Sequence, residues 1–206
     1  MTGSLAIRPY TRGLHDLGNG AWAWLQPSGS WGWSNAGLVV DGEHPLLVDT
    51  LFDLKLTAEM LAAMRESVPA ARSVGAVVNT HANGDHCNGN SLLPGAEIIA
   101  TVAAAEEMRH ETPAVMAEYK KAAPALGEMG EFILHCFGAF DFEGITQRLP
   151  TRTFSGSLAL AVGDKQVELT QVGPAHTHGD TLVHVPADKV VYTGDILFIE
   201  GHPIMW

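Results

Sequence analysis

The sequence is poor in cysteine and has no long apolar run. Its 206 residues contain two cysteines, Cys87 and Cys136, which cannot form a disulfide framework and are expected as free thiols in a reducing compartment. No apolar stretch approaches the ~20 residues needed to cross a bilayer. The first residues show no basic region followed by an apolar core, so they do not form a secretory signal. We therefore expect a cytoplasmic protein with no membrane partner.

Positive charge is also scarce. Lysine and arginine number 12 against 23 aspartates and glutamates, which gives a net charge of −11 with histidine neutral. This balance argues against a nucleic-acid backbone or an anionic membrane surface as partner, and a small-molecule substrate is expected instead. The sequence shows no internal repeat, low-complexity tract or linker. We expect one domain over residues 1–206, which is long enough for a sizeable core.

Apolar periodicity and turn residues divide the chain into strands and helices. The predicted strands cover residues 21–25, 35–41, 45–49, 74–78, 96–100, 153–161, 166–171, 181–185 and 189–193. The predicted helices cover residues 53–68, 101–109 and 113–123, and residues 125–150 favour a helix followed by a loop. The order of strands, helices and strands again favours two sheets packed face to face with helices outside.

The most informative stretch is residues 80–90. It holds two imidazoles, a carboxylate, a thiol and three amides, directly after the apolar run at 74–78. Glycine and asparagine after a strand predict a loop. His81, Asp85 and His86 are preferred ligands of zinc or a similar divalent ion, so this loop is expected to bind metal.

Residues 81–86, His-Ala-Asn-Gly-Asp-His, resemble the His-x-His-x-Asp-His signature of the metallo-β-lactamase-fold hydrolases. Residues 173–180, which include His176, resemble the next ligand loop of that family, and residues 190–195 resemble its bridging-aspartate strand. The resemblance runs from about residue 35 to the end. It implies an α/β fold, a four-layer αβ/βα sandwich with the metal site at one edge between the sheets.

The resemblance also implies two half-sites for metal. One would use positions 81, 83 and 176, the other positions 85 and 86, with position 195 bridging the two ions. Zinc is the expected metal, as one or two ions, with iron or manganese as alternatives. A bound divalent ion lowers the pKa of its water toward ~7, and Asp85 could orient that water. The implied metal ligands are His81, Asn83, Asp85, His86, His176 and Asp195.

The sequence departs from the family pattern at two places. Asn83 stands where the family has its second histidine, and a neutral amide oxygen binds zinc weakly. Asn83 is therefore a weak ligand, a hydrogen-bonding neighbour of the ligands or a spectator. His202 is the only histidine after Asp195, and its surroundings do not match the last ligand of the family. We expect a chain that lacks the C-terminal portion of the fold, with exposed apolar sheet surface that a second copy could cover.

Other residues near these motifs have less specific roles. Trp31 and Trp33 flank a glycine in a polar loop, where the resemblance implies a mobile hairpin over the substrate and ordinary packing is the alternative. Asp49 is expected to make structural hydrogen bonds near the site. Cys87 is expected to be a small buried residue, and His178 to face solvent.

The sequence thus favours a metal-dependent hydrolase that attacks an ester, lactone, thioester or amide carbonyl. An iron-dependent oxidoreductase in the same pocket, similar to a sulfur dioxygenase, is the first alternative. A non-catalytic metal-binding protein with a decayed site is the second, because the second and last histidines of the family pattern are both missing.

Overall fold

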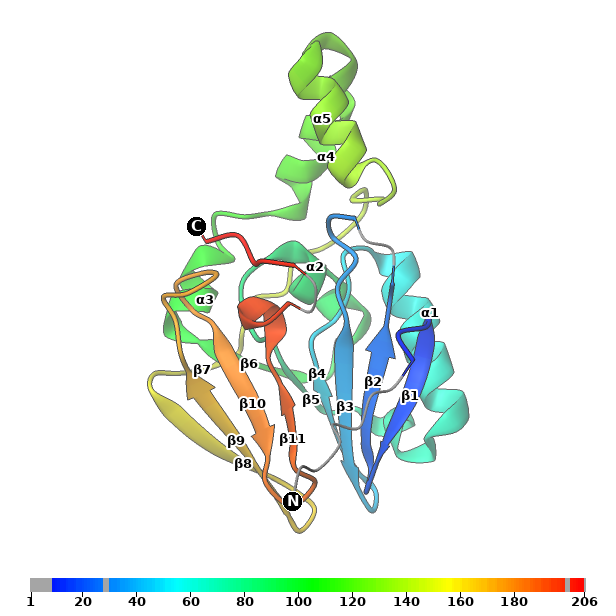
Figure 1. Cartoon of the computed structure of the whole chain (residues 1–206), viewed down its shortest axis with the longest axis vertical. Coiled ribbons are helices and arrows are strands. Elements are labelled where there is room, and N and C mark those ends of the chain that lie inside the picture. The colour runs from blue at the N-terminus through cyan, green and yellow to red at the C-terminus, as the bar shows by residue number, and fades with distance from the viewer. Residues whose placement is uncertain (1–8, 28–29, 199–200, 206) are drawn as a thin grey trace.

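The computed structural model describes residues 9–27, 30–198 and 201–205, and these form two β-sheets with helices outside (Figure 1). The seven-stranded sheet has the order β1 (Gly13–Gly18), β2 (Ala21–Leu25), β3 (Ala36–Asp41), β4 (His44–Val48), β5 (Ala76–Val78), β6 (Glu97–Thr101) and β7 (Arg152–Phe154). The four-stranded sheet has the order β11 (Val190–Tyr192), β10 (Thr181–Val185), β9 (Lys165–Gln171) and β8 (Ser157–Val162). The α-helices are α1 (Leu54–Ser67), α2 (Gly84–Cys87), α3 (Val102–Glu107), α4 (Pro113–Ala122) and α5 (Glu128–Phe137).

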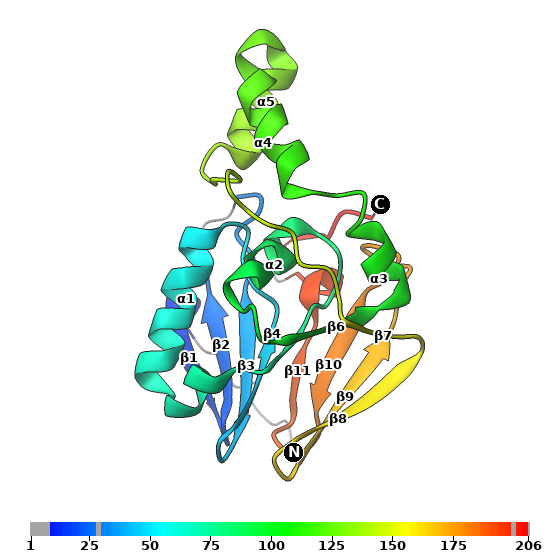
Figure 2. The same cartoon turned by 180° about the vertical axis from the view of Figure 1, so that it is seen from behind.

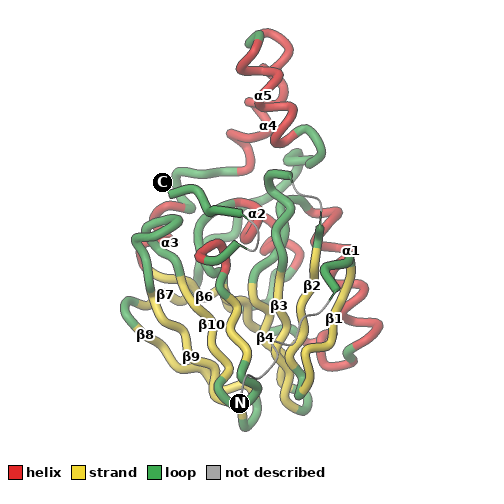
Figure 3. The backbone as a smooth tube through the Cα atoms, viewed as in Figure 1, coloured by secondary structure: helices red, strands yellow, loops and turns green. Residues whose placement is uncertain are grey.

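Each sheet keeps a simple strand order. Strands β1 to β4 pair antiparallel, and β4 to β7 pair parallel. The four-stranded sheet is antiparallel throughout. Helices α1, α2 and α3 lie on one side of the molecule, in front in Figure 2. Figures 1 and 3 show that the segment after β5, the loop between β9 and β10 and the turn after β11 gather with α2 at one end of the sheets, so this end is where distant parts of the chain meet.

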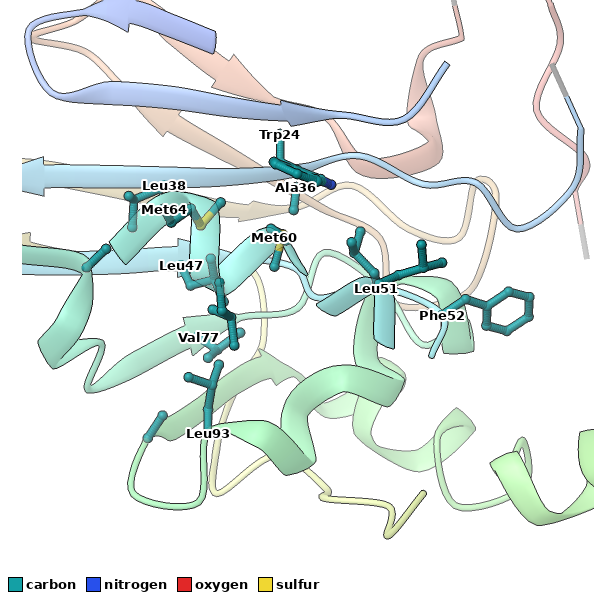
Figure 4. Close-up of a cluster of buried hydrophobic side chains, with 14 of the residues drawn as sticks. Trp24, Ala36, Leu38, Leu47, Leu51, Phe52, Met60, Met64, Val77 and Leu93 are labelled. Carbon is teal, nitrogen blue, oxygen red and sulfur yellow. The ribbon is translucent and has the colours of Figure 1, made fainter. Parts of the chain in front are cut away.

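Two cores lie on opposite faces of the seven-stranded sheet. Between the sheets, Val48 and Val78 pack in one buried cluster with Val183 of the other sheet. On the opposite face, Leu47 packs with Met60 of α1 (Figure 4). Because successive strand residues point to opposite faces, a one-residue slip of β4 would exchange the two cores. The register that places the loop after β4 is therefore strongly fixed.

Helix α1 begins and ends where its sequence predicts. Asp53 caps it by accepting a hydrogen bond from the Leu56 backbone N–H at 2.8 Å. The backbone N–H of Val68 closes the last turn on the Met64 carbonyl, and Pro69 follows. Helix α3 is also capped as predicted, since the Thr101 hydroxyl accepts a hydrogen bond from the Ala104 backbone N–H at 3.1 Å. The predicted helix at 53–68 and the predicted cap at Thr101 are confirmed.

Two local predictions are wrong, and one strand was missed. The single strand predicted at 153–161 is two strands in different sheets, because Gly156 has a left-handed φ of 71° that turns the chain out of β7 and into β8. The loop predicted after β5 contains the short helix α2, which begins after Asn83. Strand β1 was not predicted, although the Asn19-Gly20 turn behind it is a hairpin signal.

The α/β fold with two facing sheets is confirmed, and two features of its surface stand out. Helices α4 and α5 form a hairpin that projects from the body of the molecule (Figures 1 and 2). The side of the four-stranded sheet that bears the exposed Ala159, Ala161 and Val191 is not covered by any described helix. Within the described residues, no helix has both the length and the apolar character needed to cross a membrane.

Tyr192 fixes how the two sheets meet. Its hydroxyl lies 3.1 Å from the Trp22 carbonyl and 3.3 Å from the Leu38 carbonyl of the other sheet. A Cβ atom added to Gly37 would lie 2.3 Å from the Tyr192 ring, so this position has no room for a side chain.

We predict that Gly37→Ala lowers the free energy of unfolding by about 1–3 kcal/mol, because a methyl group would have to displace the Tyr192 ring. In a Tyr192→Ala background the same change should cost less, since the obstructing ring is gone. Urea unfolding of the four proteins of this double-mutant cycle measures both costs. Equal costs in the two backgrounds would contradict the packing described for Gly37.

Candidate metal centre

The histidines and carboxylates singled out by the sequence come from three segments that meet at one end of the sheets. The segment after β5 carries His81, Asp85 and His86. The β9–β10 loop carries His176, and the 3₁₀ turn at Gly194–Ile196 after β11 carries Asp195. The fold therefore brings together five side chains that span more than half of the sequence.

The Asp49 carboxylate binds the segment that carries the histidines. It is buried, follows β4 and has a left-handed φ of 63°. Its Oδ1 accepts from the Thr80 backbone N–H at 2.7 Å. Its Oδ2 accepts from the Thr80 hydroxyl at 2.7 Å and from His86 Nδ1 at 2.9 Å. The prediction that Asp49 makes structural hydrogen bonds near the site is confirmed.

All three imidazoles use Nδ1 to reach an oxygen. His81 Nδ1 lies 3.1 Å from the Thr80 hydroxyl, whose own proton goes to Asp49. His86 Nδ1 donates to Asp49, and His176 Nδ1 contacts the Ile204 carbonyl. In a neutral imidazole, an N–H on Nδ1 leaves the lone pair on Nε2, so Nε2 is the nitrogen that such a ring would offer to a metal. Such outer hydrogen bonds fix both the tautomer and the orientation of ligating histidines.

The free ends of these groups converge. The His81 ring lies 4.2 Å from the His86 ring and 4.9 Å from the His176 ring, measured between centroids. Potential ligand atoms of His81, His176 and Asp195 all lie within 4.8 Å of one another. Asp195 also reaches the other histidine, with Oδ1 at 3.1 Å from His86 Nε2. Asp85 Oδ2 lies 3.7 Å from the same nitrogen.

The donor set fits a divalent metal ion. His81 Nε2 is buried and has no hydrogen-bond partner among the described residues. His86 Nε2 is likewise buried, and the group that faces it most closely is the Asp195 carboxylate, with Oδ1 3.1 Å away. A buried polar atom without a partner costs about 1–3 kcal/mol, so two buried imidazole nitrogens that face each other and a carboxylate need a reason. Coordination of a cation by both nitrogens supplies one.

Charge at the centre also favours a cation. Burial lowers the pKa of His81 well below its usual value, which keeps this imidazole neutral. For His86, burial acts in the same direction but is outweighed by the carboxylates of Asp195, Asp85 and Asp49, so its pKa is raised. Burial likewise works to raise the pKa of Asp195, but the neighbouring histidines, His86 first, lower it. Asp195 is therefore held as a carboxylate facing the imidazoles.

Asn83 lies between His176 and Glu111 and contacts both side chains. Its Oδ1 accepts a hydrogen bond from His176 Nε2 at 2.8 Å, and its Nδ2 donates to Glu111 Oε2 at 3.1 Å. Glu111 belongs to the link between α3 and α4 and was not predicted. No pattern in the sequence points to it, because the contact depends on how that link crosses the site.

A buried amide pair supports the ligand segment and was also not predicted as part of the site. Asn79 Nδ2 donates to the His86 carbonyl at 2.9 Å, and its Oδ1 accepts from Asn90 Nδ2 at 2.8 Å. The Thr50 backbone N–H donates to the same carbonyl at 2.9 Å. The clustering of amides in residues 79–90 was a signal that could have identified this pair.

The two predicted substrate-binding tryptophans lie in the loop before β3, beside the α4–α5 hairpin. Trp31 is 39% exposed and packs edge-on against Phe132 and Phe137 of α5, with ring centroids 6.3 and 6.4 Å apart. Trp33 packs against Phe140 at 5.0 Å. The Ser34 hydroxyl donates to the Asp85 carbonyl, so this loop is tied directly to α2.

The lesser predictions for Cys87 and His178 are confirmed. Cys87 is buried, donates to the Ala82 carbonyl at 3.3 Å, and has a raised pKa, mainly through burial and then through nearby carboxylates such as Asp85. His178 is exposed and pairs with Glu107 at 2.7 Å. Neither side chain is part of the converging group.

The family model of the metallo-beta-lactamase superfamily matches residues 29–206. The chain belongs to this superfamily. Its members typically bind divalent metals, and membership supports a metal-dependent, hydrolase-type function in general.

Solved structures of the same fold are similar to this superfamily member. A metallo-beta-lactamase from Pontibacter korlensis matches with a TM-score of 0.62 and 18% identity over 89% of this chain and 71% of that one. A metallo beta lactamase from Hirschia baltica matches with a TM-score of 0.59 and 16% identity, over 88% of this chain and 69% of that one. A double mutant of the sec-alkyl sulfatase PisA1 matches with a TM-score of 0.63 and 15% identity, over 88% of this chain and 31% of that one. At these identities the likeness shows the fold alone.

We predict that Asp49→Asn lowers the free energy of unfolding by about 1–3 kcal/mol, because an amide cannot accept at both ends from Thr80 and His86. Asp164→Asn, at an exposed aspartate far from the site, serves as the matched control and should change stability by less than about 0.5 kcal/mol. Chemical denaturation measures both variants. The role assigned to Asp49 is wrong if the two substitutions cost the same.

Proposed function

We propose that this protein is a metal-dependent hydrolase, with zinc as its metal, that cleaves an ester, lactone, thioester or amide bond of a small molecule. One observation carries the proposal. Three imidazoles, held through Nδ1 by three different acceptors, leave Nε2 toward a shared space that also contains the Asp195 carboxylate. Superfamily membership supports the same chemistry.

The residues divide into two groups. His81 and His176, with Asn83 beside them, would hold one ion, and His86 with Asp85 would hold a second. Asp195 lies within 3.1 Å of His86 and 3.8 Å of His176, which suits a carboxylate shared between the two groups. A divalent ion bound here supplies a Lewis acid and a hydroxide nucleophile at neutral pH.

Asp85 is suited to handle the proton of the attacking water. Its side chain is 18% exposed, which leaves an oxygen accessible beside His86. Burial raises the pKa of its carboxyl despite the opposing effect of His86. A carboxylate that is easier to protonate is a better general base at neutral pH, and α2 fixes its position relative to His86.

An iron-dependent oxidoreductase is the second candidate. The observation that favours it is the cluster of His81, His176 and Asp195, because two histidines and one carboxylate form the ligand set of many non-haem iron sites. Metal content separates the two candidates. A small-molecule substrate, a cytoplasmic location and a possible homo-oligomer stay predictions from the sequence.

Metal analysis and hydrolysis assays on matched histidine variants test the proposal. We predict zinc in the purified protein and chelator-sensitive hydrolysis of an ester, lactone or thioester panel. His81→Ala should lower activity by roughly 100-fold or more, because it removes a ligand to the Lewis acid. His178→Ala, which changes an exposed histidine of the neighbouring loop, should stay within about two-fold.

Three results would count against the hydrolase. Stoichiometric iron with oxygen-dependent turnover would favour the oxidoreductase. Absence of bound metal after reconstitution with zinc or iron would leave a protein with a decayed site. Equal activities of His81→Ala and His178→Ala would show that hydrolysis does not use this centre.

Trp31 is proposed as a substrate-binding residue. Its indole is partly exposed and belongs to the loop whose Ser34 hydroxyl donates to the Asp85 carbonyl of α2, beside the centre. We predict that Trp31→Ala raises KM by roughly ten-fold with little change in kcat, since it removes binding that ground state and transition state share. Tyr10→Ala, at another exposed aromatic, is the control. A loss of kcat with an unchanged KM would contradict this role.

A further inference from the structure

We propose that Glu111 is a positioning residue of the metal centre, which turns the amide oxygen of Asn83 toward the first half-site and strengthens it as a ligand. This inference rests on the proposed function. It concerns the position at which the chain departs from the histidine of its superfamily, and it assigns a role to a carboxylate outside the predicted ligand set.

The geometry places Asn83 as a link between two charged or ligating groups. On one side its Nδ2 donates to Glu111 Oε2 at 3.1 Å. On the other side its Oδ1 lies 2.8 Å from His176 Nε2. Two atoms bound to one tetrahedral zinc ion at ~2.0–2.1 Å lie about 3.3 Å apart, so the two atoms need to separate only slightly to share an ion. The amide oxygen therefore lies next to the place of a ligand, and an ion bound there would replace its hydrogen bond to His176.

Glu111 decides which end of the amide faces the centre. An ionised carboxylate can only accept hydrogen bonds, so the NH₂ end must face Glu111 and the oxygen must face His176. Without Glu111 the amide could rotate and present NH₂ to the centre, where it would repel a cation and bind nothing.

The same hydrogen bond changes the amide electronically. An N–H···carboxylate bond draws the amide toward its charge-separated form and raises electron density on Oδ1. Outer carboxylates raise the basicity of ligating histidines in the same way. A neutral amide oxygen binds zinc more weakly than imidazole does. The negative charge of Glu111, hydrogen-bonded to the Asn83 amide, offsets part of this loss of metal affinity.

Backbone contacts hold both partners in place. The Glu111 N–H donates to the Glu107 carbonyl at 3.2 Å, and the Glu111 carbonyl accepts from Gln147 Nε2 at 3.2 Å. The Asn83 carbonyl accepts from the His86 N–H at 3.0 Å, the first turn of α2. The Glu111–Asn83 hydrogen bond thus joins two segments whose backbones are each fixed independently.

A double-mutant cycle on zinc affinity tests the proposal. Zinc dissociation constants are measured by competition with a chromophoric chelator for the wild type, Glu111→Gln, Asn83→Ala and the double variant. His176→Ala identifies the constant that belongs to the first half-site. We expect Glu111→Gln to weaken that constant by about 10–100-fold, as outer-ligand changes do, and to have no further effect once Asn83 is alanine.

Two further measurements separate positioning from other effects. Glu106→Ala removes an exposed carboxylate from the neighbouring helix α3 and should leave the constant within about two-fold, which controls for general charge. The visible absorption of the cobalt-substituted protein should change in Glu111→Gln, because an oxygen ligand is lost or weakened. Circular dichroism of the metal-free variants confirms that each is folded.

The outcomes distinguish this inference from the proposed function. A wild type that binds zinc tightly, with equal affinity in Glu111→Gln, would overturn the role of Glu111 and leave the hydrolase intact. An equal loss in the Asn83→Ala background would also overturn it, since Glu111 would then act without Asn83. A wild type that binds no zinc would overturn both.

Discussion

The buried carboxylate of Asp49 is the interaction on which the rest of the site depends. Its two oxygens accept three hydrogen bonds from Thr80 and His86, so the end of β4 and the ligand segment after β5 form one unit. The register of β4 is fixed in turn by the two cores on opposite faces of its sheet. Packing between the sheets therefore sets the position of the carboxylate, and the carboxylate sets the position of the imidazoles.

A single rule describes how the histidines are held. Nδ1 of each ring contacts an oxygen acceptor. The acceptor is the Thr80 hydroxyl for His81, the Asp49 carboxylate for His86 and the Ile204 carbonyl for His176. The acceptors come from different parts of the chain, yet they leave the same nitrogen toward the centre. Asn83 follows the same rule in another form, because Glu111 occupies its NH₂ end and leaves its oxygen inward. Orientation is thus built into the surroundings of the ligands.

The sequence predicts features that are encoded locally. Helix α1 has an apolar stripe and the Asp53 cap, and strand β2 has the predicted bounds. The converging residues were named through the resemblance of three short motifs to a known family. What they would bind is not tested by the fold, but the structure does bring His81, His176 and Asp195 together.

The features that the sequence did not predict depend on contacts between distant residues. The sequence on both sides of Gly156 favours one continuous strand. Only the pairing partners distinguish β7, which pairs with β6, from β8, which pairs with β9. Helix α2 is a single turn in a segment rich in asparagine and glycine, which favour loops. Glu111 reaches Asn83 across 28 positions of sequence, and no periodicity connects them.

The central claim is that imidazole and oxygen groups of this centre bind a metal ion together. X-ray absorption at the zinc edge of the zinc-loaded protein tests it most directly. We predict a shell of nitrogen and oxygen neighbours at ~2.0–2.1 Å with the multiple scattering of at least two imidazoles. A sulfur neighbour at ~2.3 Å, or a shell without imidazole scattering, would contradict the account.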